Sequence, residues 1–250
     1  MRRALVLSDV HGNAAALEAI AAAEPHDAVI CLGDIMGYGP EPAACTRWMR
    51  ERATLAVQGN HDRAFGERVP PRCSQRFRWL SEATAPIATA QLTECDRRYL
   101  ASLPHWAYLE MCGARYMFVH ATPRDPLYEY LGPDSAAWAV QLTGIDADVV
   151  VVGHTHLQFD ITVGNARVVN PGSVGQPKDG DPRAAYAVIE DGVMSLHRVS
   201  YPVERTVEAL HSHGLADPAL AELASLLRTG RVPTVRTSSS GPERRDSVRG

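Results

Sequence analysis

The sequence predicts an α/β protein with mixed sheets. Short apolar runs rich in Val, Ile and Leu recur along the 250-residue chain, and each ends in a polar or glycine-rich turn, as buried strands do. Amphipathic helical patterns separate the first of these runs, which is typical of parallel strands joined by right-handed helical crossovers. Beyond residue 166 the runs follow one another directly, so we expect antiparallel strands to join the sheets and give the fold some α+β character.

Alternating strands and helices are expected in the N-terminal part of the chain. Asn13 can cap a helix that extends through Ala23, because its side chain can accept from a free backbone N–H. Pro42 suits the first turn of a second helix, where its missing N–H costs nothing. The runs that predict strands are at residues 4–9, 28–34, 54–60, 116–120 and 148–154.

Residues 64–110 depart from this rhythm and predict a helical insertion beside the core, with one helix at 93–103. After the insertion, Asp134 is expected to cap a helix at 135–142, which ends near Gly144.

The C-terminal part predicts three strands, at 167–170, 184–190 and 193–199. Asp191 and Gly192 separate the last two and are a strong signal for a hairpin turn.

A final helix is expected at 218–229, with Asp217 as its cap, Pro218 in its first turn and Gly230 past its end. Residues 1–230 are therefore predicted to form a single domain, which contains the insertion.

Residues 231–250 are predicted to be a flexible tail. They hold five arginines against two acids, Glu243 and Asp246. A solvated terminus is the simpler interpretation of this charge, and an anion-binding arm is the alternative.

The composition favours a cytoplasmic protein. Hydrophobic residues make up 45% of the chain and charged residues 22%, as in ordinary globular proteins. The net charge of −4 gives no chain-wide basic field for nucleic acid. The five cysteines are odd in number and form no CxxC, which favours free thiols. The apolar run near the N-terminus is too short for a signal peptide, and no run approaches the length of a membrane span.

Polar side chains that can bind metals follow each of the five apolar runs. They are Asp9 and His11 in SDVHGN, Asp34 in GDIMGYGP, Asn60 and His61 in GNHD, His120, and His154 and His156 in VVGHTH. Ligands in open α/β sheets bind beyond the carboxyl ends of strands, so these side chains are expected to converge.

Each of these motifs alone is weak evidence, since a DxH pair or a GNH tripeptide is more often a polar turn. Together they predict a metal centre. Mixed carboxylate, imidazole and amide ligands suit Mn, Fe, Zn, Co or Ni, and they do not suit a closed structural zinc site. Eight candidate groups are too many for one ion and about right for two that share a carboxylate.

The motifs DxH, GD, GNHD, H and GHTH, in this order, resemble those of the calcineurin-like metallophosphoesterase superfamily. The resemblance extends from about Arg3 to Val199. The stretches GDIMGYGPEP and NPGSVGQPKDGDPRAAYAVIE resemble a bacterial subgroup of small phosphodiesterases and diadenosine tetraphosphatase-like hydrolases. This resemblance implies a four-layer α-β-β-α sandwich with a dinuclear metal centre at one edge.

The resemblance also implies a role for each candidate residue. Asp9, His11 and His156 would hold one metal ion, and Asp34 would bridge it to the other. The second ion would be held by Asn60, His120 and His154. His61 would face the substrate instead of a metal.

These roles predict hydrolysis of a phosphoester by two divalent cations, with manganese as the first choice. A metal-bridging hydroxide would attack phosphorus in line with the leaving alkoxide, and protonated His61 would act as the general acid. The neighbouring Asp62 is expected either to orient His61 or simply to begin the next turn.

The substrate is expected to be a small phosphodiester or nucleotide. Tyr38 is a candidate pocket residue, with a packed loop tyrosine as the alternative. Arg72 and Arg76 belong to a basic segment that follows His61 directly and could reach a polyphosphate, with a solvated helix face as the alternative. If they face the site, a diadenosine polyphosphate is favoured over a plain monoester.

Other functions were weighed against this one. Family members that dephosphorylate proteins carry an arginine where this chain has GDIMGYG, so a phosphoprotein or other monoester substrate is the weaker alternative. A protein-binding scaffold, like the retromer subunit that resembles these enzymes, would lack the full ligand set. A nuclease would want a basic groove, and the sequence gives no clear sign of one. The oligomeric state has no signal in the sequence.

Overall fold

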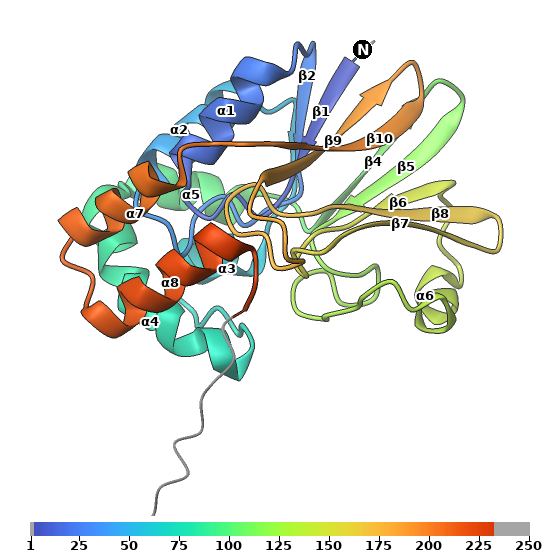
Figure 1. Ribbon diagram of the computed structural model, residues 1–250. Coiled ribbons are helices and arrows are strands. Elements are labelled where there is room, and N and C mark those ends of the chain that lie inside the picture. The colour runs from blue at the N-terminus through green and yellow to red at the C-terminus, as the bar shows by residue number, and fades with distance from the viewer. Residues whose placement is uncertain (1–2, 233–250) are drawn as a thin grey trace, which may run out of the picture.

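Two five-stranded mixed sheets stacked face to face form the centre of the protein, which we describe from a computed structural model covering residues 3–232 (Figure 1). The first sheet has the order β10-β9-β1-β2-β3, and the second has the order β4-β5-β6-β8-β7. β1, β2 and β3 are parallel, as are β5, β6 and β8, and the remaining pairs are antiparallel.

The strands of the first sheet are β1 (Arg3–Leu7), β2 (Ala28–Cys31), β3 (Leu55–Ala56), β9 (Ala184–Glu190) and β10 (Val193–Val199). Those of the second sheet are β4 (Trp106–Met111), β5 (Ala114–Val119), β6 (Val149–Val151), β7 (Gln158–Val163) and β8 (Ala166–Pro171). The helices are α1 (Ala14–Ala23), α2 (Pro42–Arg52), α3 (Asn60–Glu67), α4 (Gln75–Gln91), α5 (Glu94–Ser102), α6 (Ser135–Leu142), α7 (Val203–Ser212) and α8 (Asp217–Thr229).

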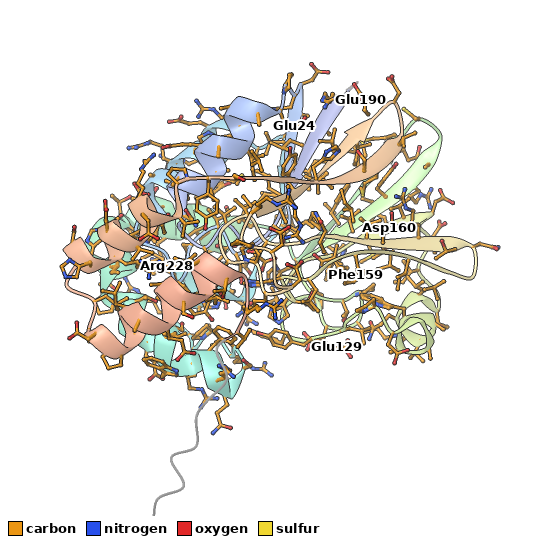
Figure 2. The ribbon with its side chains drawn as sticks, in the orientation of Figure 1. Glu24, Glu129, Phe159, Asp160, Glu190 and Arg228 are labelled. Carbon is orange, nitrogen blue, oxygen red and sulfur yellow. The ribbon has the colours of Figure 1, made fainter. Side chains whose placement is uncertain are left out.

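Alternate residues of the strands fill two different cores, which makes the fold a four-layer α-β-β-α sandwich. On β1, Leu5 and Leu7 pack against α1 and α2, whereas Ala4 and Val6 face the second sheet. The outer face of the second sheet packs against α6 through the buried Trp138. Figure 2 draws the side chains that fill these layers. The sandwich implied by the motifs is therefore confirmed.

Most predicted elements are present, with shifted ends. Asn13 caps α1 by accepting the backbone N–H of Ala16, and Pro42 begins α2. Asp191 and Gly192, both with positive φ, form the turn between β9 and β10. The prediction for Asp217 was wrong, because α8 is capped by Ala216 and Asp217 lies in its first turn without a capping hydrogen bond.

The helical insertion predicted at 64–110 is helical only through Ser102. Its last residues form β4, an edge strand of the second sheet whose burial alternates along the strand. The helices α4, α7 and α8 share a separate apolar cluster at one end of the sandwich. This cluster was not predicted, because α7 was not expected and the helical insertion at 64–110 was not divided into α4 and its neighbours.

All five cysteines are free thiols, as expected. None of the helices within residues 3–232 combines the length and hydrophobicity that crossing a bilayer requires. Of the tail predicted at 231–250, residues 233–250 lie outside the described part of the chain.

Candidate metal centre

The loops that follow β1, β2, β5 and β6, together with the start of α3 after β3, bring all seven predicted metal ligands to one edge of the sandwich. Each side chain is buried: Asp9, His11, Asp34, Asn60, His120, His154 and His156. Five strands in two sheets therefore deliver polar groups to one place, as the strand-end pattern predicted.

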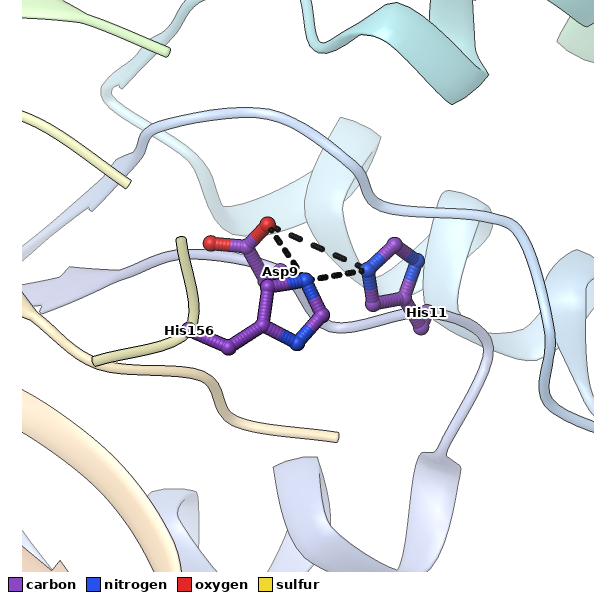
Figure 3. A group of neighbouring side chains, drawn as sticks. All are labelled: Asp9, His11 and His156. Atoms are coloured by element: carbon purple, nitrogen blue, oxygen red, sulfur yellow. Dashed lines mark hydrogen bonds and ion pairs between the residues drawn. The ribbon is translucent and has the colours of Figure 1, made fainter. Parts of the chain in front are cut away.

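Asp9, His11 and His156 form the first group, in which the candidate ligand atoms lie within 4.8 Å of one another (Figure 3). The Nε2 atoms of the two histidines are 3.1 Å apart. Asp9 Oδ1 lies 3.2 Å from His156 Nε2 and 3.8 Å from His11 Nε2.

The tautomers of these two histidines leave their Nε2 lone pairs facing each other. His156 Nδ1 donates to the Gln176 carbonyl at 2.5 Å, and His11 Nδ1 to the Met36 carbonyl at 3.4 Å. Because a carbonyl only accepts, the proton of each ring is on Nδ1, and Nε2 is an acceptor. Two lone pairs and the Asp9 oxygen, which has no hydrogen-bond partner in the described chain, thus converge on one point. A cation is the group that this arrangement fits.

The second group has the same character. His120 Nδ1 donates to the Leu32 carbonyl at 2.8 Å, so His120 Nε2 is also an acceptor. It faces two further acceptors, Asn60 Oδ1 at 3.2 Å and Asp34 Oδ2 at 3.5 Å. His154 Nδ1 lies 3.1 Å from His120 Nε2. The Asn60 amide nitrogen donates to the Pro71 carbonyl, which turns its oxygen toward this group.

Asp34 lies between the two groups. Its Oδ2 is 3.7 Å from His11 Nε2 and 3.5 Å from His120 Nε2. Its other oxygen accepts the backbone N–H of His61 at 2.9 Å, which fixes the orientation of the carboxylate. This position suits a carboxylate shared by two cations.

The backbone at the site is held in an unfavourable conformation. Nine described residues other than glycine have positive φ, and five of them are predicted ligands: Asp9, His11, Asp34, His154 and His156. The left-handed conformation costs free energy for residues with a Cβ, and such strain concentrates at functional sites. The orientation of these side chains toward the site therefore costs the folded state some stability.

Burial sets the charges of the site. It lowers the pKa values of His11, His120, His154 and His156, so these imidazoles are neutral near pH 7, the form that binds metals. Burial also raises the pKa of the Asp34 carboxyl, and the nearby Asp9 and Asp62 carboxylates raise it further. A bound cation would offset this repulsion.

His61 lies beside the metal groups and makes ring contacts with two neighbours. Its ring centre is 5.2 Å from that of His11 and 4.8 Å from that of Tyr38. Burial, followed by the charges of Lys178 and His120, lowers the pKa of His61 to about 3. His61 is therefore neutral at pH 7 in this structure, whereas the sequence analysis expected its protonated form.

Asp62 supports the loops and not the His61 ring. Its carboxylate accepts the backbone N–H groups of Gly59 at 3.1 Å and Ile35 at 2.9 Å. It thus closes the first turn of α3 and ties the loop after β2 to that helix. Of the two roles weighed for Asp62, the structure shows the one at the start of the turn.

The three candidate substrate residues have different surroundings. Tyr38 is buried between His11 and His61, at the metal groups. Arg72 stacks on the ring of Tyr128 at 4.1 Å, and Arg76 pairs with Glu222 of α8 at 3.8 Å.

Two further arginines of the basic segment are paired with acids. Arg63 pairs with Glu67 at 2.9 Å, and Arg68 with Glu94 at 3.6 Å. Glu67 of the same segment, Glu94 of α5 and Glu222 of α8 therefore each pair with one of its arginines.

Lys178 was not predicted from the sequence as a residue of the site. Its Nζ lies 3.5 Å from His156 Nε2 and 4.0 Å from the centre of the Phe77 ring. Burial lowers the pKa of Lys178 to about 8, although Asp9 and Asp34 act in the opposite direction. Lys178 follows β8, which is parallel to β6, so the strand-end rule that found the ligands could have found it too.

The loop 172–178 also holds two ligands in place, although the sequence marked it only as a turn. The Ser173 hydroxyl donates to the Asp9 carbonyl at 2.8 Å, and the Gln176 carbonyl accepts from His156. These bonds give the loop a positioning role behind the first group.

Comparison with known proteins gives consistent matches. Residues 2–192 match the calcineurin-like phosphoesterase superfamily domain. An uncharacterised protein of Methanocaldococcus jannaschii is 30% identical over 234 residues, covering 85% of this chain and 93% of that protein. The phosphodiesterase YfcE of Escherichia coli is 26% identical over 202 residues, covering 78% of this chain and 91% of YfcE.

Among solved structures, a metallophosphoesterase from Sphaerobacter thermophilus superposes with a TM-score of 0.76 at 33% identity. The match covers 90% of this chain and 99% of that one. The similarity therefore extends over most of both chains.

Proposed function

Because this chain belongs to the calcineurin-like phosphoesterase superfamily, we propose that it is a phosphodiesterase that acts on a small phosphodiester or nucleotide with two divalent cations. The chain is a hydrolase of the metallophosphoesterase type. Our proposal adds a substrate class, the number of metal ions and a role for individual residues.

The observation that carries the proposal is the convergence of carboxylate and imidazole groups at two neighbouring positions. Asp9, His11 and His156 would hold one cation, and Asn60, His120 and His154 the other, with Asp34 shared between them. Bound cations at these positions would neutralise charge on the phosphoryl group and activate water. The mixed oxygen and nitrogen donors suit manganese first, and Fe, Zn, Co or Ni as well.

We assign to His61 the protonation of the leaving group. His61 belongs to neither group of candidate ligands, yet its ring is in contact with the rings of His11 and Tyr38. The charge of a bound phosphoryl group would raise the pKa of the imidazole, so substrate binding itself would favour the donor form. His61 would then pass a proton to the oxygen that leaves phosphorus.

We assign to Lys178 the binding of a phosphoryl oxygen of the substrate. Its ammonium group lies 3.5 Å from an atom that would bind a cation, so the two positive charges would repel each other. An anion between them removes that repulsion. We therefore expect Lys178 to contact a non-bridging oxygen of the substrate.

The preference for a diester rests on two points. YfcE, a relative over most of its length, is named a phosphodiesterase. The loop GDIMGYG of this chain also lacks the arginine that family members acting on phosphoproteins carry at this place. A diadenosine polyphosphate remains the second candidate through Arg72, which makes no ion pair with an acid among the described residues.

A substrate screen tests the proposal. The purified protein is reconstituted with Mn²⁺ and assayed with a bis-aryl phosphodiester, an aryl monoester, cyclic nucleotides and diadenosine tetraphosphate. We expect fastest turnover with a diester and none in the Asp34→Asn variant. Exclusive hydrolysis of the monoester, or full activity of Asp34→Asn, would contradict the proposal.

A further inference from the structure

A cavity of about 170 Å³ lies beside His61, between α3 and α4. Ala64 and Phe65 of α3 form one wall, and Thr84 and Ala88 of α4 form the other. His61 stands at the boundary between this space and the metal groups. The space is called the α3–α4 cavity below.

The α3–α4 cavity is suited to an uncharged group. Among the described residues that line it, His61 is the only one with an ionisable side chain. The hydroxyls of Thr84 and Thr89 already donate to carbonyls of their own helix, those of Leu80 and Ala85. A phosphate placed there would meet no cationic side chain and would lose its hydration.

The α3–α4 cavity is adjacent to His11 of the first group of candidate ligands. Met36 and Gly37 line it, and both touch His11 from the other side. The Met36 carbonyl accepts from His11 Nδ1, and a Cβ on Gly37 would lie 2.5 Å from that same atom. His61 lines this space and its ring contacts that of His11, so His61 lies between the cavity and the first group of candidate ligands.

We propose that the α3–α4 cavity is the subsite for the leaving group, and that this group is an uncharged alcohol or phenol with one ring. The inference rests on the proposed phosphoesterase function and narrows its substrate class. An apolar cavity of about 150 Å³ is large enough for benzene, so one aromatic ring fits. In diadenosine tetraphosphate the leaving group begins with a charged phosphate, which this cavity disfavours.

The chemistry balances with His61 at the boundary. Water forms a new P–O bond as the P–O bond to the leaving group breaks. One proton of the water stays on the oxygen of the monoester product, and the other is passed on, directly or through exchange with solvent, so that the leaving oxygen gains one proton. The neutral alcohol or phenol then occupies a cavity without charged walls.

Binding of phenol to metal-free protein tests the site independently of catalysis. We expect saturable chemical-shift changes at residues of α3 and α4. The Ala64→Leu and Ala85→Leu variants, whose side chains line the cavity, should each weaken phenol binding about tenfold, equivalent to about 1.4 kcal/mol. Ala90→Leu is the control, an exposed alanine of the same helix outside the cavity lining.

Kinetics provide the second measurement. With Mn²⁺, both cavity variants should raise KM for a bis-aryl phosphodiester, and the KM for diadenosine tetraphosphate should stay unchanged. Hydrolysis of the diester without phenol binding, or equal effects on both substrates, would overturn the subsite alone. Phenol binding without any phosphoesterase activity would instead refute the proposed function, and with it the leaving-group role.

Discussion

Gly59 leaves no space for a side chain, because a Cβ at this position would lie 2.1 Å from Oδ1 of Asp34. The Asp34 backbone nitrogen would be only 2.2 Å away. The carboxylate that lies between the two metal groups is thus held against a bare backbone. A single methyl group at residue 59 must displace it.

Gly59→Ala should therefore lose metal although Gly59 is not a ligand. We expect the variant to bind less than half the manganese of the wild type, as measured by mass spectrometry after reconstitution and gel filtration. Gly132→Ala is the matched control, since a Cβ at Gly132 meets nothing within 4 Å. Normal metal content in Gly59→Ala would show that Asp34 does not bridge the ions.

His61→Ala should separate metal binding from turnover. The side chain belongs to neither ligand group, so we expect unchanged metal content and a fall in kcat of about 10²- to 10⁴-fold, the usual value of a general acid. The exposed His105 provides the control, and His105→Ala should retain full activity. Unchanged turnover in His61→Ala would remove this residue from the mechanism.

Lys178→Met should raise KM more than it changes metal content. Loss of one ammonium contact to a phosphoryl oxygen is expected to cost about 1.5 to 3 kcal/mol, or roughly ten- to hundredfold in KM. Lys178→Arg keeps the charge and should recover part of the affinity. Equal KM values for the Met and Arg variants would mean that the charge of Lys178 does not contact the substrate.

Acid should weaken the contacts of Asp96 with Thr93 and Arg50, which belong to neither group of candidate ligands. Burial alone would raise the pKa of Asp96, but hydrogen bonds from Thr93 and the charge of Arg50, at 2.8 Å, lower it below its usual value. A carboxyl with a lowered pKa stabilises the fold above pH 4 and loses that contribution as the pH falls through its folded value. Asp96→Ala should cost about 1 kcal/mol at pH 7 and much less near pH 3, as measured by urea unfolding. A pH-independent difference would contradict this.

Local patterns in the sequence were enough to predict that the candidate ligands converge, because each follows the end of a buried strand. Asp9 and His156 are 147 positions apart, yet both follow strands whose carboxyl ends lie at the same edge. The roles of supporting residues needed the fold. Lys178 reaches the site from a loop that looked like an ordinary turn.

The full extent of α4 and the acidic partner of Arg76 could not be predicted from local sequence. α4 contains Pro86, which is unfavourable inside a helix, so the full length of α4 was not predicted within the insertion. Arg76 was counted with a basic segment, but its partner Glu222 lies 146 positions away on α8. Local sequence cannot show which distant acids the fold will bring to a cluster of arginines.

The number and position of bound metal ions test the central claim most directly. A crystal of the manganese-loaded protein, measured at the manganese absorption edge, should show two anomalous peaks per chain. We expect one peak beside Asp9, His11 and His156, the other beside Asn60, His120 and His154, and the Asp34 carboxylate between them. A single peak, or none within ligand distance of these side chains, would contradict the two-cation centre.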